Sequence, residues 1–187
     1  MTEEHAKSKP QFSGPDRILD FADYLLAGEE EEARPEEHYE TWVVFRIAGG
    51  SYGLPVTHVR QVSRCGEMTR VPGAPFPVLG VTALRGQALP VIDLGERLGV
   101  GPVEVRDATR ILVAEVRRRK LGLLVDRVDQ VMQFAQSRVQ SVSASDVGSE
   151  AAELLIGAYP LPEDSILMLD VEKLLLGGQS AEKGETG

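Results

Sequence analysis

Three groups of residues in this sequence have side chains that could support chemistry. His58 and Cys65 could act together, with the imidazole removing the proton of a thiol nucleophile. Asp126 and Asp129 could supply carboxylate oxygens to a metal ion. Arg85 could bind a carboxylate of another molecule, because its planar guanidinium presents parallel N–H donors. These possibilities correspond to a thiol enzyme, a metal centre and a protein-binding surface.

The first two possibilities lack the sequence context that they need. A cysteine is reactive when its pKa is lowered, and a single cysteine beside a glycine, such as Cys65, is more often a packed residue. The sequence has no Gly-x-Ser-x-Gly motif and no group of His, Cys, Asp and Glu with metal-ligand spacing. We therefore predict no catalytic residue, no metal and no cofactor. A small thiol enzyme using Cys65 and His58 is kept as the alternative from another class.

Arg85 and Gly86 separate two apolar segments, at 78–84 and 87–94. A two-residue insert with glycine in second place is typical of a tight β-hairpin turn. The base of this hairpin is expected to be buried, so that its tip is rigid and presents one cation beside an apolar surface. No nucleophile, metal-ligand pair or phosphate-binding loop lies next to Arg85. The pattern favours a surface that binds another macromolecule.

The elements around this hairpin are those of a mainly β protein. Short runs of β-branched and apolar residues predict strands at 41–47, 52–56, 109–116, 121–126, 128–134, 154–161 and 165–169. Asp93 and Asp170 are expected to cap the only two helices of this region, at 94–98 and 171–176. Other segments are predicted as a helical turn at 57–61, a weaker strand pair at 62–71, a turn at 117–120 and a loop at 141–151. Closely spaced short strands favour small β-barrels, although composition alone leaves a sandwich open.

Charge divides the chain into an acidic extension and a balanced region. The net charge is −9. The excess acid lies mainly in residues 1–40, whereas acids and bases are equal in number in 41–176. We therefore expect no nucleic acid partner, and we interpret the basic run 117–120 as a solvated turn. With one cysteine, no signal-peptide pattern and no apolar stretch near the roughly 20 residues of a membrane span, a cytoplasmic protein without direct membrane insertion is expected.

The extension contains one amphipathic segment. We predict a short helix at 15–27, because Ser13 and Asp16 have capping-box spacing and Pro15 suits a first helical turn. Its apolar face consists of Ile18, Phe21, Ala22, Leu25 and Leu26. A helix of this length is marginal alone in water, so we expect it to fold when docked on a partner protein. The rest of 1–40 and the tail 177–187 are predicted to be disordered.

Several motifs resemble, in order, those of CheW-type chemotaxis coupling proteins. The hairpin segment Gly80-Val-Thr-Ala-Leu-Arg-Gly-Gln-Ala-Leu-Pro-Val-Ile-Asp-Leu94 is similar to the signature of that family. The resemblance covers about 41–176. It also includes the opening segments at 45–47, 52–56 and 59–62, the prolines Pro72 and Pro75, and the later segments at 122–128, 156–157 and 166–175.

The resemblance implies a fold and a set of partner-binding residues. The implied fold is two small SH3-like β-barrels packed together, with the end of the chain returning to the first barrel. The residue that matches Arg85 lies at the receptor-contact surface of the family, and Val59, Gln61, Gly80 and Gly86 match positions of the same binding region. The family commonly has Glu where this chain has Gln61. This difference removes a charge, although an amide can still form hydrogen bonds.

The resemblance also implies a function without turnover. The protein would be an adaptor that couples the cytoplasmic tip of a chemoreceptor to a CheA-type histidine kinase in membrane-associated receptor arrays. Its pseudo-symmetric barrels would mimic the regulatory domain of the kinase and complete rings. The alternative within the family is an accessory adaptor, which would use residues 15–27 to recruit a localisation or motility protein.

Overall fold

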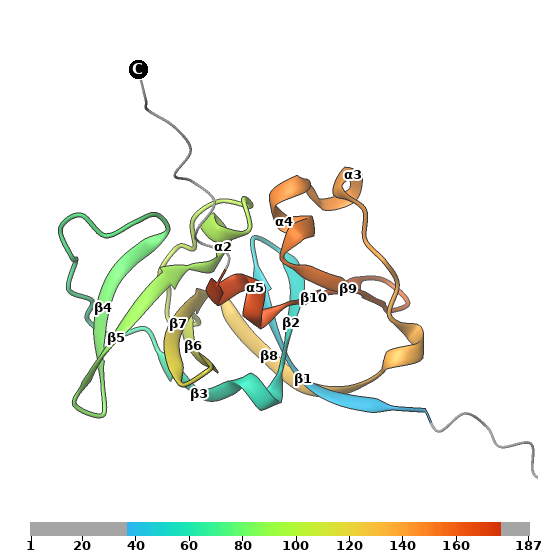
Figure 1. The fold of residues 1–187 in the computed structure, drawn as a ribbon, viewed down its shortest axis with the longest axis horizontal. Helices are drawn as coiled ribbons and strands as arrows, with labels where there is room; N and C mark the ends of the chain where they lie inside the picture. The colour runs from blue at the N-terminus through green and yellow to red at the C-terminus, as the bar shows by residue number, and fades with distance from the viewer. Residues whose placement is uncertain (1–36, 177–187) are drawn as a thin grey trace, which may run out of the picture. The chain divides into compact units, whose positions relative to one another are not determined.

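The computed structural model describes residues 37–176, which form two five-stranded β-sheets (Figure 1). We name them sheet A and sheet B. Neighbouring strands of sheet A follow the order β8 (Arg127–Ala135), β1 (Tyr39–Ile47), β2 (Gly50–Pro55), β10 (Ser165–Leu169) and β9 (Leu155–Pro160). Those of sheet B follow the order β3 (Val59–Arg64), β6 (Arg110–Val116), β7 (Arg119–Val125), β5 (Gln87–Asp93) and β4 (Val78–Leu84). The predicted helix at 15–27 and the predicted disordered segments at 1–36 and 177–187 lie outside the described residues.

The helices of the described region are short. They are the α-helices α2 (Leu94–Arg97), α3 (Ala144–Val147), α4 (Ser149–Glu153) and α5 (Val171–Leu176), with the 3-10 turns η1 (Val56–His58) and η2 (Gln136–Arg138). Within residues 37–176, none of the helices has the length and apolar character needed to cross a bilayer. The mainly β architecture with short helices confirms the predicted fold class.

One hydrophobic core joins the two sheets. Phe45 and Leu54 of sheet A and Leu112 and Leu123 of sheet B are fully buried in the same cluster. A smaller cluster fills the interior of sheet A alone, around Trp42, Phe134 and other buried side chains. Because the larger cluster contains side chains from both sheets, burial of apolar surface holds the sheets together.

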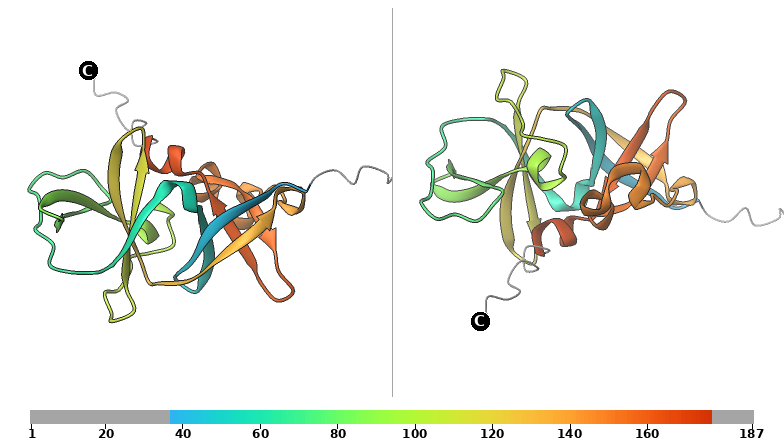
Figure 2. Two further views of the ribbon diagram at one scale, coloured as in Figure 1. Left: turned by 90° about the horizontal axis from the view of Figure 1, so that it is seen from below. Right: turned by 90° about the horizontal axis from the view of Figure 1, so that it is seen from above.

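The two sheets are built from a duplicated unit whose parts are exchanged between them. The hairpin β1–β2 belongs to sheet A, but the chain then enters sheet B as β3, β4 and β5. The hairpin β6–β7 belongs to sheet B, and the chain then returns to sheet A as β8, β9 and β10. Each sheet also contains one parallel pair, β2 with β10 and β5 with β7. The views in Figure 2 show the orange β9 and β10 on the side of the blue β1, as this exchange requires.

Strand register makes the duplication visible in the sequence. Gly53 and Gly122 occupy the same place in the two parallel pairs, opposite Met168 and Val91. The residues that follow read Gly-Leu-x-Val-x-x-Val-x-Gln-Val at both 53–62 and 122–131. Aligned this way, β3 corresponds to β8, and the β4–β5 hairpin corresponds to the β9–β10 hairpin.

Each sheet closes on itself through an isolated bridge. In sheet B, Thr69 and Val81 exchange two backbone hydrogen bonds of 2.8 and 2.9 Å. In sheet A, Gln140 and Ala158 exchange two bonds of 2.9 and 2.8 Å. The neighbouring glycine of each bridge, Gly80 or Gly157, faces the partner's carbonyl oxygen so closely that a Cβ atom would overlap it.

Most predicted elements occur close to their expected positions, and two local predictions are wrong. The segment 141–151 is not a loop, because it contains α3 and α4. Ser143 and Asp146 form a capping box there: the Asp146 carboxylate accepts from the backbone N–H of Ser143 at 3.2 Å. This local hydrogen bonding stabilises a helical turn despite a polar sequence. The second error is the helical turn at 57–61, since η1 ends at His58 and β3 begins at Val59.

Candidate partner-binding surface

The hairpin formed by β4 and β5 presents Arg85 at its tip, as the sequence predicts. Leu84 pairs with Gln87, which leaves Arg85 and Gly86 as a two-residue turn. Both residues have positive φ, at 50° and 78°. A turn of this kind matches the twist of the two strands, and glycine adopts the required conformation without strain. The guanidinium of Arg85 is therefore held at an exposed and defined position.

A pocket of about 270 Å³ connects this tip to the neighbouring strands. Arg85 lies on its rim and Gln61, from β3, on another side, so the fold brings together two residues that are distant in the sequence. Its lining consists of Arg60, Gln61, Leu84, Arg85, Gln87, Val113 and Lys120. We call this the hairpin pocket. Its lining combines three cations and two amides with two apolar side chains, a composition suited to binding a polar segment of a protein.

The other predicted partner-binding residues have structural roles that can be read directly. Val59 is half-buried against the shared core, beside the strand position of Gln61. Gly80 is buried and allows the bridge that closes sheet B. Gly86 provides the left-handed conformation of the hairpin turn. A direct contact between these three residues and a partner stays a prediction, while their contribution to the shape of the hairpin follows from the fold.

Sequence reasoning missed three residues of the hairpin pocket: Arg60, Gln87 and Lys120. Lys120 was interpreted as part of a solvated turn, but β7 begins at Arg119, and the turn itself is only Arg117 and Arg118. The strand pairing of Lys120 with Glu115 places it beside the pocket. The internal repeat could have revealed this, because it aligns the β6–β7 hairpin with the β1–β2 hairpin.

His58 and Cys65 do not form a catalytic pair. They lie at opposite ends of β3, and an extended segment of that length separates them by about 20 Å. The ring of His58 contacts the hydroxyl of Thr57 at 3.4 Å. Cys65 is half-buried, and this burial raises the pKa of its thiol. A raised pKa makes the thiolate scarcer at neutral pH, which is the opposite of activation.

The two aspartates considered as metal ligands are bound to protein donors. Asp126 accepts a hydrogen bond of 2.7 Å from the backbone N–H of Ala48. Asp129 accepts from Nε of Arg46 at 3.0 Å and from Nε of Arg127 at 2.8 Å. No group of three or more His, Cys, Asp and Glu suited to a metal ion occurs within residues 37–176. These carboxylates fix the turn of β1–β2 and the start of β8.

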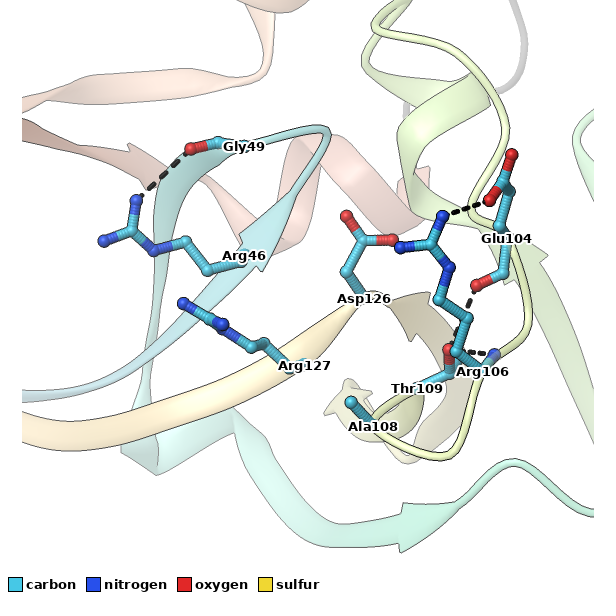
Figure 3. A pocket seen from close by; sticks show the side chains of 8 residues that line it. All are labelled: Arg46, Gly49, Glu104, Arg106, Ala108, Thr109, Asp126 and Arg127. Carbon is cyan, nitrogen blue, oxygen red and sulfur yellow. Dashed lines mark hydrogen bonds and ion pairs between the residues drawn. The ribbon is translucent and has the colours of Figure 1, made fainter.

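A second pocket, of about 310 Å³, lies beside these residues. Figure 3 shows Arg46 and Arg127 on one of its sides and Arg106, paired with Glu104, on the other. Arg46 also donates to Asp164 at 3.2 Å. The charges around this pocket largely neutralise one another through internal ion pairs, unlike those of the hairpin pocket.

Comparison with known proteins identifies the family. The model of the CheW-like domain matches residues 41–177. The chain is 36% identical over 102 residues to the chemotaxis protein CheW of Bacillus subtilis, an alignment that covers 54% of this chain and 65% of that protein. It is 32% identical over 134 residues to the probable chemotaxis protein CheW of Rhizobium etli, covering 71% of this chain and 84% of the relative. Protein FrzA of Myxococcus xanthus is 31% identical over 147 residues, which are 77% of this chain and 88% of FrzA.

A solved structure gives the same result. The scaffolding protein TtCheW of Thermoanaerobacter tengcongensis superposes with a TM-score of 0.66 at 27% identity, over 75% of this chain and 90% of that one. The two exchanged β-sheets, the Arg85 hairpin and the match over residues 41–177 therefore lead to one conclusion. This chain belongs to the CheW-like domain family.

Proposed function

We propose that this protein is a non-catalytic adaptor in chemotaxis signalling, which couples the cytoplasmic tip of a chemoreceptor to a CheA-type histidine kinase. It would work in the cytoplasm, at arrays of membrane-bound receptors. Its contribution is to bind both partners and set their relative position. Membership of the CheW-like family supports the signalling role.

The observation that supports the receptor contact is the meeting of Arg85 and Gln61 in one pocket. These residues come from different strands, and both match family positions of the receptor-binding region. Arg85 is exposed on a rigid turn, so little side-chain and backbone ordering is needed when a partner binds. An arginine so placed suits an interface hot spot, because it can pair with a carboxylate through two parallel hydrogen bonds.

The absence of turnover is supported by the surroundings of the candidate nucleophile. The Cys65 thiol has a raised pKa, and the imidazole nearest to it in sequence lies at the far end of β3. The alternative of a small thiol enzyme therefore loses its argument. Alkylation of Cys65 is expected to leave receptor and kinase binding unchanged, as measured by titration of both partners before and after modification.

The test of the receptor contact is the charge reversal Arg85→Asp. Aspartate tolerates a left-handed backbone better than most residues, so we expect the variant to fold. Replacing a cation by an anion at an interface costs about 2 to 5 kcal/mol, which weakens binding by roughly 30-fold or more. The measurement is a calorimetric titration with the cytoplasmic fragment of a chemoreceptor from the same organism.

Arg106→Asp is the matched control, since it makes the same charge change beside the second pocket. Its affinity is expected to stay within a few-fold of the wild type. The proposed function would be rejected if the wild-type chain bound neither the receptor fragment nor the kinase. Equal affinity of Arg85→Asp and wild type for the receptor would remove the hairpin pocket from the contact.

A further inference from the structure

The hairpin pocket carries an excess of positive charge. Arg60, Arg85 and Lys120 line it, and none of its lining residues is acidic. Arg60 donates to Glu115 at 3.2 Å, which neutralises one of the three cations. Within residues 37–176, neither Arg85 nor Lys120 has an ion pair or a side-chain hydrogen bond. Two cations of the pocket are therefore available to a partner.

The internal duplication supplies a comparison for the ion pair. By strand register, Arg60 and Glu115 of sheet B correspond to Asp129 and Arg46 of sheet A. That pair is also present, at 3.0 Å, with the charges exchanged. An ion pair at this position is thus a feature of both barrels and belongs to the structure of each. It does not account for the remaining cations of the hairpin pocket.

The next pair in the register differs between the two barrels. Lys120 and Gln87 of sheet B correspond to Ser51 and Asp164 of sheet A. In sheet A the serine hydroxyl donates to the carboxylate at 2.6 Å, so both groups are satisfied internally. In sheet B an ammonium faces an amide, and no hydrogen bond joins them within the described region. Where one barrel satisfies its polar groups, the other leaves donors for an external acceptor.

Gln61 completes this chemistry. A carboxylate at its position would neutralise a neighbouring cation and favour a basic group of the partner, whereas an amide leaves the pocket positive. Leu84 and the buried Val113 offer apolar surface to the methylene groups of an incoming side chain. All polar groups of the lining are then compatible with an acidic ligand.

We propose that Lys120 and Gln61 determine specificity in the hairpin pocket and select a partner segment with two neighbouring carboxylates, one bound by Arg85 and the other by Lys120. This inference rests on the proposed function, since it specifies the chemistry of the segment that the adaptor recognises. It predicts that the common family residue, Glu, is unfavourable at position 61 of this chain. Binding is also expected to weaken with added salt, because partly exposed charges are screened.

The experiment uses the full chain and two peptides, hexaglutamate and hexalysine, followed by NMR chemical shifts. Hexaglutamate is expected to move the resonances of Gln61 and Lys120, and hexalysine is not. Gln61→Glu is expected to weaken hexaglutamate binding about tenfold, and Lys120→Gln by a similar factor, since each removes about one unit of favourable charge. Gln130→Glu is the matched control, because Gln130 is the register equivalent of Gln61 in sheet A. Its affinity is expected to stay within twofold.

The same variants are titrated with the chemoreceptor fragment, where Gln61→Glu is again expected to weaken binding. Tighter or unchanged binding of Gln61→Glu, or a response of the pocket to hexalysine, would overturn the inference and leave the proposed function standing. A wild-type chain that binds hexaglutamate at the pocket but neither receptor nor kinase would overturn the proposed function instead. The acidic selectivity of the pocket would then be retained for a different partner.

Discussion

Replacing Asp93 by alanine is expected to destabilise the protein much more than the same change at its repeat equivalent, Asp170. Asp93 is buried, with 2% of its surface exposed. One of its oxygens accepts from the backbone N–H of Glu96 at 3.1 Å and caps α2. The other accepts from the backbone N–H of Val103 at 2.9 Å, which holds the loop after α2. Asp170 has only the cap, to the N–H of Lys173 at 3.1 Å, and its side chain is 27% exposed.

The expected magnitudes follow from these contacts. Loss of a helix N-cap costs about 1 kcal/mol, within a range of roughly 0.5 to 2. Asp93→Ala additionally leaves the buried N–H of Val103 without an acceptor, which costs about 1 to 3 kcal/mol. We therefore expect a loss of about 2 to 4 kcal/mol for Asp93→Ala and about 1 kcal/mol for Asp170→Ala.

Urea unfolding followed by tryptophan fluorescence measures both losses. Trp42 is the only tryptophan and is buried in sheet A, so its emission reports unfolding of the barrels. With a slope of about 2 kcal/mol per molar urea, the midpoint should fall by about 1 to 2 M for Asp93→Ala and by about 0.5 M for Asp170→Ala. Equal losses for the two variants would show that the bond to Val103 contributes nothing and would refute the reasoning.

Three further predictions concern the bridges, the pH dependence and the extension. Gly80→Ala and Gly157→Ala should each destabilise by at least about 1 to 3 kcal/mol in the same urea assay, because the added Cβ overlaps a carbonyl of the closing bridge; a loss below 0.5 kcal/mol would contradict this. The Ser51 hydroxyl, and then the Ser165 N–H and Arg46, lower the pKa of Asp164. Its stabilising effect should therefore be complete above the unfolded pKa of about 3.9 and be lost as pH falls through the lower folded pKa. Unfolding curves from pH 7 to pH 2 should show the advantage of wild type over Asp164→Asn shrinking in that window, and a constant advantage would argue against an ionised Asp164. Deleting residues 1–40, which removes the first two residues of β1, should still leave the melting temperature nearly unchanged while abolishing one protein contact; a large drop would assign these residues to the core.

The sequence predicted the local features of the site because they depend on local stereochemistry. Arg85 and Gly86 between apolar runs predict a two-residue turn, since only certain residues tolerate positive φ there. Asp93 and Asp170 predict helix starts because a short side chain can accept from the N–H three residues later. The segment 141–151 was mistaken for a loop, because a composition rich in serine and alanine does not reveal a capping box.

What the sequence by itself determined is the strand pattern, the hairpin and the family resemblance, all of which are written in neighbouring residues. The tertiary structure decided which strands share a barrel. The exchange of β3 and β8 between the sheets places Gln61 and Arg60 beside the β4–β5 hairpin and Lys120, and no periodicity in the chain encodes that meeting. The charge balance of a pocket depends on these long-range contacts, because ion pairs such as Arg60 with Glu115 form only when distant strands are adjacent. The residues available to a partner were therefore fixed by packing.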